Sequence, residues 1–117
     1  MKDEIDLALR AKQFALRVIR LFSALPKDSL AQTLGKQALR SGASVGAHYR
    51  EVRRAKSRRD FIGKIDGALG ELDETQYWIE LLAESGVISS RRLDPLHAEA
   101  NELLAIFTTI SKRAKGA

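Results

Sequence analysis

The fold is decided by residues 40–82, which read RSGASVGAHYREVRRAKSRRDFIGKIDGALGELDETQYWIELL. This stretch joins a helix of small residues, a dense basic turn, and a second helix that carries glycines, paired acids and the single tryptophan. Apolar residues recur at helical spacing on both sides of the turn. The stretch therefore predicts two consecutive helices around which the rest of the chain is organised.

The helix after the turn is expected to be apolar on one side and rich in glycine on the other. Ser57 and Asp60 form an S-x-x-D capping signal, so the helix is predicted to begin near Arg58. Its core stripe comprises Phe61, Ile65, Ala68, Leu72, Thr75, Ile79 and Leu82. The opposite side comprises Gly63, Gly67, Gly70, Glu74, Tyr77 and Leu81. Such an outer face suits a groove that receives another helix, from this chain or from another subunit.

The helix before the turn is predicted to run from Ser29 to about Lys56. Ser29 and Gln32 form an S-x-x-Q capping pattern. The expected core face has unusually small side chains for a core and comprises Leu30, Leu34, Ala38, Ser41, Val45, His48 and Val52. A flanking stripe comprises Gly35, Gly42 and Gly46. Each interior glycine costs about 0.5–1 kcal/mol relative to alanine, so three of them predict the close approach of another backbone.

The first helix is predicted over about residues 3–24, before the break at Pro26. One apolar face comprises Leu7, Ala11, Phe14, Val18, Leu21 and Leu25. A second set, on roughly the opposite side, comprises Ile5, Leu9, Leu16 and Ile19. A helix that is apolar on two sides is either central to the core or buried once inside the chain and once against a partner.

The last helix follows a stop at Gly86, where a left-handed cap is expected. Asp94 and Pro95 are a suitable N-cap and first-turn pair, although Ser90 is an alternative, earlier start. The single apolar face of this helix comprises Leu96, Ala100, Leu103, Phe107, Ile110 and Ala114.

Four helices with short connectors predict an all-α protein, an antiparallel up-down-up-down four-helix bundle. The 117 residues suffice for one domain with one core, so residues 1–117 are expected to form a single domain. The chain has no cysteine, which excludes disulfides and fits a reducing cytoplasm. The N-terminus lacks the apolar segment of a signal peptide, and no apolar run is long enough to span a bilayer. A cytoplasmic protein without a membrane partner is therefore expected.

Four segments together resemble the bacterial four-helix-bundle family that is encoded within intervening sequences of 23S rRNA genes. They are QALRSGASVGAH at 37–48, SRRDFI at 57–62, ALGELDETQYW at 68–78 and LHAEANELLAIF at 96–107. The likeness covers nearly the whole chain, and its most specific part is the segment that joins the second and third helices. The family is similar to the accessory bundle protein of diversity-generating retroelements. The resemblance implies a homopentamer with a positively charged surface and a role in nucleic-acid binding.

The basic turn is the only ligand surface that the residues themselves indicate. It comprises Arg50, Arg53, Arg54, Lys56, Arg58 and Arg59, in a chain of net charge +5. Such a cluster at one end of a bundle, near a helix N-terminus, would hold phosphate groups of RNA or DNA without selecting a base sequence. The alternative is a solvated helix end whose charges pair with Glu51 and Asp60. No aromatic residue lies within the basic run to stack on bases.

Other candidate chemistry is incomplete. Glu71, Asp73 and Glu74 suggest a metal or acid/base site, but bundle di-iron sites need Glu-x-x-His pairs that the chain lacks. His48 and His97 form no catalytic triad. The sequence therefore predicts no enzyme, no catalytic residue, no metal, no cofactor and no small-molecule substrate. The leading hypothesis is a non-enzymatic homo-oligomer, and the second is a nucleic-acid accessory protein. The residues expected at the subunit interface are Leu9, Leu16, Gly63, Gly67, Gly70, Glu74, Tyr77 and Leu81.

Overall fold

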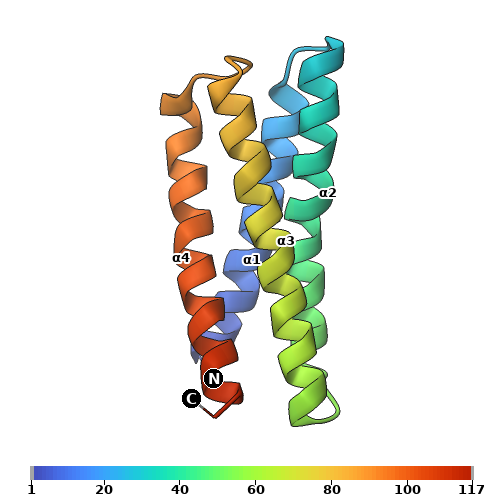
Figure 1. Cartoon of the computed structure of the whole chain (residues 1–117), viewed down its shortest axis with the longest axis vertical. Helices are drawn as coiled ribbons and strands as arrows, with labels where there is room; N and C mark the ends of the chain where they lie inside the picture. The colour runs from blue at the N-terminus through green and yellow to red at the C-terminus, as the bar shows by residue number, and fades with distance from the viewer. Residues whose placement is uncertain (1, 117) are drawn as a thin grey trace.

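Four long helices make up the protein in a computed structural model, which describes residues 2–116, with side chains from residue 7 onward. They are α1 (Lys2–Ala24), α2 (Ser29–Val52), α3 (Arg58–Glu84) and α4 (Ser90–Ala114). Each helix runs antiparallel to the next, in a bundle of 45 × 22 × 21 Å (Figure 1). The predicted four-helix bundle is therefore confirmed. Among the described residues, no helix is long and apolar enough to cross a membrane.

The core contains the apolar stripes that the helical spacing predicts in α1, α3 and α4. Phe14 of α1 and Phe107 of α4 are completely buried, as are Leu72 and Ile79 of α3. The ring of Tyr49 stacks on that of Phe107, with ring centroids 5.5 Å apart. Burial of each large side chain of this kind contributes roughly 1.5–3 kcal/mol, so these stripes supply the main driving force for folding.

The buried face of α2 differs from the prediction by a rotation toward α1. Leu30 is 52% exposed, whereas Ala31, Gly35, Gly42 and Tyr49 are buried. The reason is that α2 packs against both α1 and α3, so its glycine stripe lies inside the bundle. The prediction followed the largest apolar side chains and was wrong at Leu30.

The glycines of α2 allow α1 to approach closely, as expected. A Cβ added to Gly42 would lie 2.9 Å from both methyl groups of Val18. A Cβ added to Gly46 would lie 3.6 Å from the backbone of Ala11. Gly35 lies against the side chain of Leu25. Close packing against Phe22, Leu25 and Val18 thus offsets the conformational cost of Gly35 and Gly42, whereas a Cβ would fit at Gly46.

Both predicted boundaries of α2 are wrong, the N-cap by one residue and the last residue by four. The N-cap is Asp28, whose side chain accepts a hydrogen bond from the Ala31 amide at 3.0 Å, and Ser29 is the first helical residue. The helix ends at Val52 and does not continue to Lys56. Arg53 is the C-cap of α2, and the extended N-cap of α3, Ser57, follows four residues later.

The connection between α3 and α4 confirms one expectation and selects between two others. Gly86 has a φ of +81° and ends α3, as predicted. The last helix begins at Ser90, the earlier of the two expected starts, and Pro95 lies inside it. The expected N-cap at Asp94 is therefore wrong.

Candidate functional site

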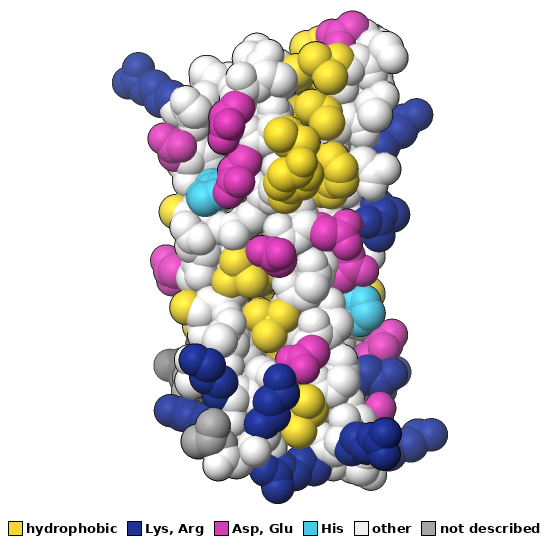
Figure 2. Space-filling view, viewed as in Figure 1, with side chains coloured by type: hydrophobic (Ala, Val, Ile, Leu, Met, Phe, Trp, Pro, Cys, Tyr) yellow, Lys and Arg dark blue, Asp and Glu magenta, His cyan; other side chains and the backbone are white. Residues whose placement is uncertain are grey.

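Positive charge gathers at the end of the bundle that contains the α2–α3 turn. Figure 2 shows Lys and Arg side chains concentrated there, and Figure 1 shows that both chain termini lie at the same end. The cap of α3 fixes this turn: Ser57 Oγ accepts from the Asp60 amide at 3.0 Å, and Asp60 Oδ2 accepts from the Lys56 amide at 3.0 Å. The predicted Ser57 cap is confirmed. We call this surface the basic end.

Most cations of the predicted cluster are free for a ligand. Arg50, Arg53, Arg54, Lys56 and Arg59 are all exposed. No carboxylate among the described side chains lies within ion-pair distance of any of the five. The predicted alternative, in which acids of the turn neutralise them, is wrong for Glu51, because that carboxylate pairs with Lys64 at 3.1 Å.

Arg58 has a different role from its neighbours. Its Nε donates a hydrogen bond to the carbonyl oxygen of Ala114, so it holds the last turn of α4 against the start of α3. Next to it, Asp66 accepts from the Ser111 hydroxyl at 2.7 Å and pairs with Lys115 at 3.1 Å. The Ser111 hydrogen bond, with the Lys115 contact, lowers the pKa of the Asp66 carboxyl although partial burial opposes this.

These contacts bring further cations to the basic end. Lys112 and Arg113 lie in the last turn of α4 and are exposed, and Lys115 follows directly. They are not part of the basic cluster that the sequence predicts as a ligand surface, which ends at Arg59. Their contribution follows from the antiparallel packing of α4 on α3, which places the end of one helix beside the start of the other.

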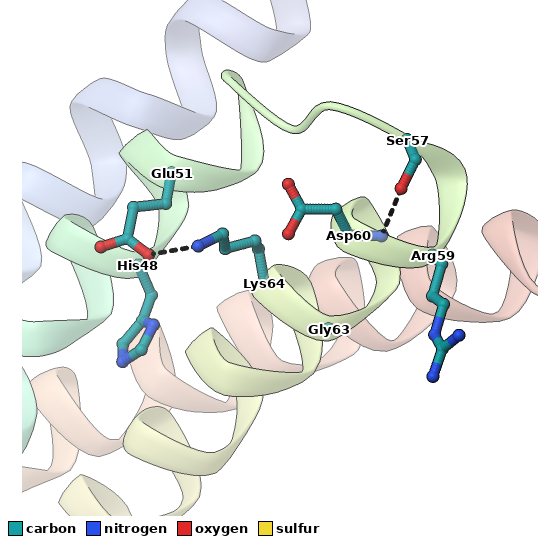
Figure 3. Close-up of a pocket in the computed structure, with 7 residues that line it drawn as sticks. All are labelled: His48, Glu51, Ser57, Arg59, Asp60, Gly63 and Lys64. Atoms are coloured by element: carbon teal, nitrogen blue, oxygen red, sulfur yellow. Dashed lines mark hydrogen bonds and ion pairs between the residues drawn. The ribbon is translucent and has the colours of Figure 1, made fainter.

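A shallow cavity of about 560 Å³ lies beside the turn, between α2 and α3 (Figure 3). Figure 3 shows Lys64 directed at Glu51, while the guanidinium of Arg59 extends away from the other labelled side chains. Hydrogen bonding and attraction to Glu51 raise the pKa of Lys64. Two contacts join residues that line the cavity: Lys64 donates to Glu51 at 3.1 Å, and the Asp60 amide donates to the Ser57 hydroxyl at 3.0 Å. Among the described residues no group of three or more His, Cys, Asp or Glu side chains could hold a metal ion.

The acidic residues of α3 connect it to α2. Arg40 contacts Glu74 at 2.8 Å and Glu71 at 3.7 Å, and His48 Nε2 lies 3.5 Å from Glu71. Both glutamates therefore form ion pairs with side chains of α2. Asp73 is exposed. The ion pairs of Glu71 and Glu74 thus lie across the contact between α2 and α3.

The outer faces of α1 and α3 carry most of the exposed apolar side chains. Leu9 and Leu16 of α1 are 50% and 41% exposed, and Tyr77 of α3 is 55% exposed. Leu81 is half-buried. Ile19 is also exposed, and Ile5 lies outside the described side chains. In Figure 2, apolar side chains gather over the half of α3 that is remote from the basic end.

The three outer glycines of α3 have different surroundings. A Cβ added to Gly63 or Gly70 would meet nothing within 4 Å. A Cβ added to Gly67 would lie 3.1 Å from His48 Nδ1, so the space beside that glycine is already occupied by α2. Among the described residues, therefore, no close contact explains Gly63 or Gly70.

The comparisons with known proteins agree with one another. The family described as 23S rRNA-intervening sequence protein matches residues 3–109. The crystal structure of a protein of unknown function from the S23 ribosomal protein family of Bacteroides thetaiotaomicron is similar, at 35% sequence identity and a TM-score of 0.85. The similarity covers 91% of this chain and 98% of that one. The comparison with curated proteins finds no match. On its fold and on these two likenesses, the chain belongs to the family of 23S rRNA-intervening sequence proteins.

Proposed function

We propose that the protein is a non-enzymatic homo-oligomer whose copies meet through the outer faces of α1 and α3. The observation that supports this most directly is the pair of open glycines, Gly63 and Gly70. Each costs about 0.5–1 kcal/mol in a helix interior, and no contact among the described residues offsets that cost. A helix of a second copy, lying close to the α3 backbone, would offset it.

The exposed leucines of α1 supply an apolar surface that could meet the α3 face of a neighbouring copy. Ala11 packs on Gly46, and His48, two residues further along α2, packs on Gly67. Leu9 therefore lies at about the height of Gly67, between the two open glycines, and Leu16 lies about two turns further from the basic end. α1 and α3 occupy diagonal corners of the bundle, so their outer faces point in opposite directions (Figure 1).

Contact between two different faces is head-to-tail, and it forms a closed ring if the rotation between copies closes. Five copies are the number implied by the likeness to the accessory bundle protein of diversity-generating retroelements. We place this assembly in the cytoplasm, in keeping with the absence of cysteine from the chain.

The assembly is tested by light scattering coupled to size exclusion. The unmodified protein should have several times the 13.0 kDa mass of one chain at micromolar concentration. Gly70→Leu and Leu81→Arg should each lower the mass while the circular dichroism of the helices is retained. Gly67→Leu is unsuitable because it would collide with His48 in the same chain. A monomeric unmodified protein would contradict the proposal.

A second candidate function is the binding of RNA or DNA through the basic end. The supporting observation is that five exposed cations of the turn lack a carboxylate partner among the described side chains, and α4 adds Lys112 and Arg113 beside them. Phosphate contacts of this kind are independent of base sequence. Repeated around a ring, they would form a continuous basic rim.

This second function is tested by fluorescence anisotropy with a labelled duplex at a series of salt concentrations. The logarithm of the affinity should fall linearly with the logarithm of the salt concentration. Reversing Arg53, Arg54 and Arg59 to glutamate should abolish binding, and Arg58 should be kept because it holds α4 in place. Reversal of Lys27 and Lys36, which lie away from the turn, is the control. The absence of binding at low salt would remove this function.

A further inference from the structure

The seam between α1 and α4 contains a groove of about 310 Å³ in the half of the bundle remote from the basic end. These two helices contact each other less than the other neighbouring pairs do. Leu21, Leu93 and Leu96 are among the residues that line the groove. Arg17, Arg20 and Arg92 line it as well, and no carboxylate does. Among the described side chains, none of these three arginines has an ion-pair partner.

The start of α4 adds to the positive potential of this groove. The side chain of the N-cap residue, Ser89, makes no capping hydrogen bond, and the first turn contains no acid. It contains Arg91 and Arg92 instead, at the end of the helix that favours negative charge. A partner of this groove should therefore combine apolar side chains with carboxylates.

The outer face of α3 has this composition. Tyr77 and Leu81 are flanked by Asp73, Glu74, Glu80 and Glu84, and all four acids are exposed. Glu74 and Glu80 pair within the chain with Arg40 and His97. Asp73 and Glu84 have no cationic partner among the described side chains.

The two surfaces also lie at matching heights along the bundle. Val18, between the two α1 arginines, packs on Gly42. Thr75 Oγ1 donates a hydrogen bond to the Oγ of the adjacent Ser41 at 2.8 Å. Arg17 and Arg20 are therefore at about the same height along the bundle as Thr75, which lies within the acidic face. In the same way, His97 of α4 pairs with Glu80 at 2.8 Å. Since α3 and α4 are antiparallel, Arg92, five residues before His97, stands at about the height of Glu84.

We propose that the acidic outer face of α3 in one copy docks in the arginine-rimmed groove between α1 and α4 of the next copy. The inference rests on the proposed homo-oligomer and identifies the partner surface of the α3 face. Tyr77 and Leu81 contact the leucines of the groove, while the carboxylates face the arginines. In a ring whose axis runs along the bundle, neighbouring copies are not shifted relative to each other along that axis. The arginines of one copy are then level with the acidic residues of the next and can contact them. Complementary charge then sets the register between copies.

Two variants, each with one altered surface, test this pairing. The groove variant carries Arg17→Glu, Arg20→Glu and Arg92→Glu, and the acid variant carries Asp73→Lys and Glu84→Lys. Each variant alone should be a monomer, because it lacks one of the two surfaces. Their mixture should associate into species of at least twice the 13.0 kDa chain mass, since the intact α3 face of one variant fits the intact groove of the other and the two reversed surfaces are complementary in charge to each other. A control with Lys27→Glu, Lys36→Glu and Arg54→Glu should keep the mass of the unmodified protein.

The outcomes separate this inference from the function on which it rests. If the unmodified protein is a monomer, the proposed assembly itself fails. If the unmodified protein is oligomeric and the groove variant has the same mass, only the pairing fails. The groove would then bind something other than a second copy of the chain. A mixture of variants that are both helical by circular dichroism but do not associate would also overturn the pairing.

Discussion

Replacement of Gly42 by alanine tests whether close packing explains the glycines of α2. The new Cβ would lie 2.9 Å from both methyl groups of Val18, and Val18 is buried with little room to move. Overpacking of this kind costs about 1–3 kcal/mol. The gain in helix propensity from glycine to alanine is about 0.5–1 kcal/mol. We therefore expect Gly42→Ala to lower the free energy of unfolding despite the better helix former.

The difference in helix propensity between glycine and alanine can be measured separately in the same helix. Ala47 is exposed, so Ala47→Gly should destabilise by the propensity difference alone, about 0.5–1 kcal/mol. The steric cost at Gly42 is then its observed destabilisation plus this propensity term. Urea unfolding, followed by circular dichroism at one fixed protein concentration, gives both values.

The result that would refute the reasoning is a stabilised Gly42→Ala protein, with a gain equal to the loss in Ala47→Gly. That outcome would mean that the space between α1 and α2 accepts a methyl group without strain. Shortening the opposing side chain provides a second check. In the background of Val18→Ala, the Gly42→Ala change should become neutral or stabilising, because the two clashing methyl groups are gone.

Three further predictions concern the interior and the basic end. Because the pKa of Asp66 is lowered in the folded protein, its contribution to stability is present above its unfolded pKa and is lost as the pH falls through its folded pKa. Ser111→Ala should raise the folded pKa of Asp66, which carbon-13 NMR measures. An unchanged pKa would exclude the Ser111 hydroxyl as the cause. Thr75→Val keeps the shape of the side chain but removes its contact with Ser41, and chemical denaturation should show a loss of about 1 kcal/mol, whereas no loss would show that the hydroxyl contact is dispensable. Phe107→Ala empties the centre of the core and should cost about 3–5 kcal/mol in thermal unfolding, and a cost below that of the other two changes would contradict its central position.

The elements themselves were largely predictable, because each depends on local chemistry. Ser57 caps α3 and Gly86 ends it, since the first needs a side-chain acceptor and the second a positive φ. Leu30 was mispredicted because periodicity gives a direction around one helix axis but cannot say how far a second neighbour covers that helix. Asp94 was mispredicted because Pro95 is compatible with the first turn and also with the position inside α4 that it occupies.

The candidate surfaces were less predictable, since they combine residues that are distant along the chain. The sequence indicated the cations of the α2–α3 turn, whereas those at the end of α4 join them only through the contacts of Arg58 and Asp66. Similarly, Arg17 and Arg92 are 75 positions apart and line one groove only because α4 returns beside α1.

The sequence by itself determined the helical class, the number of helices and the apolar stripes of α1, α3 and α4, because helix periodicity and capping depend on residues within a few turns of one another. Tertiary structure alone decided which of the small and charged residues are free. It placed Gly42 against Val18 but left Gly70 open, and it engaged Arg58 while leaving Arg53 with no carboxylate partner among the described side chains. The physical reason is that a side chain's burial and pairing depend on the neighbouring helix, whose position no local pattern contains.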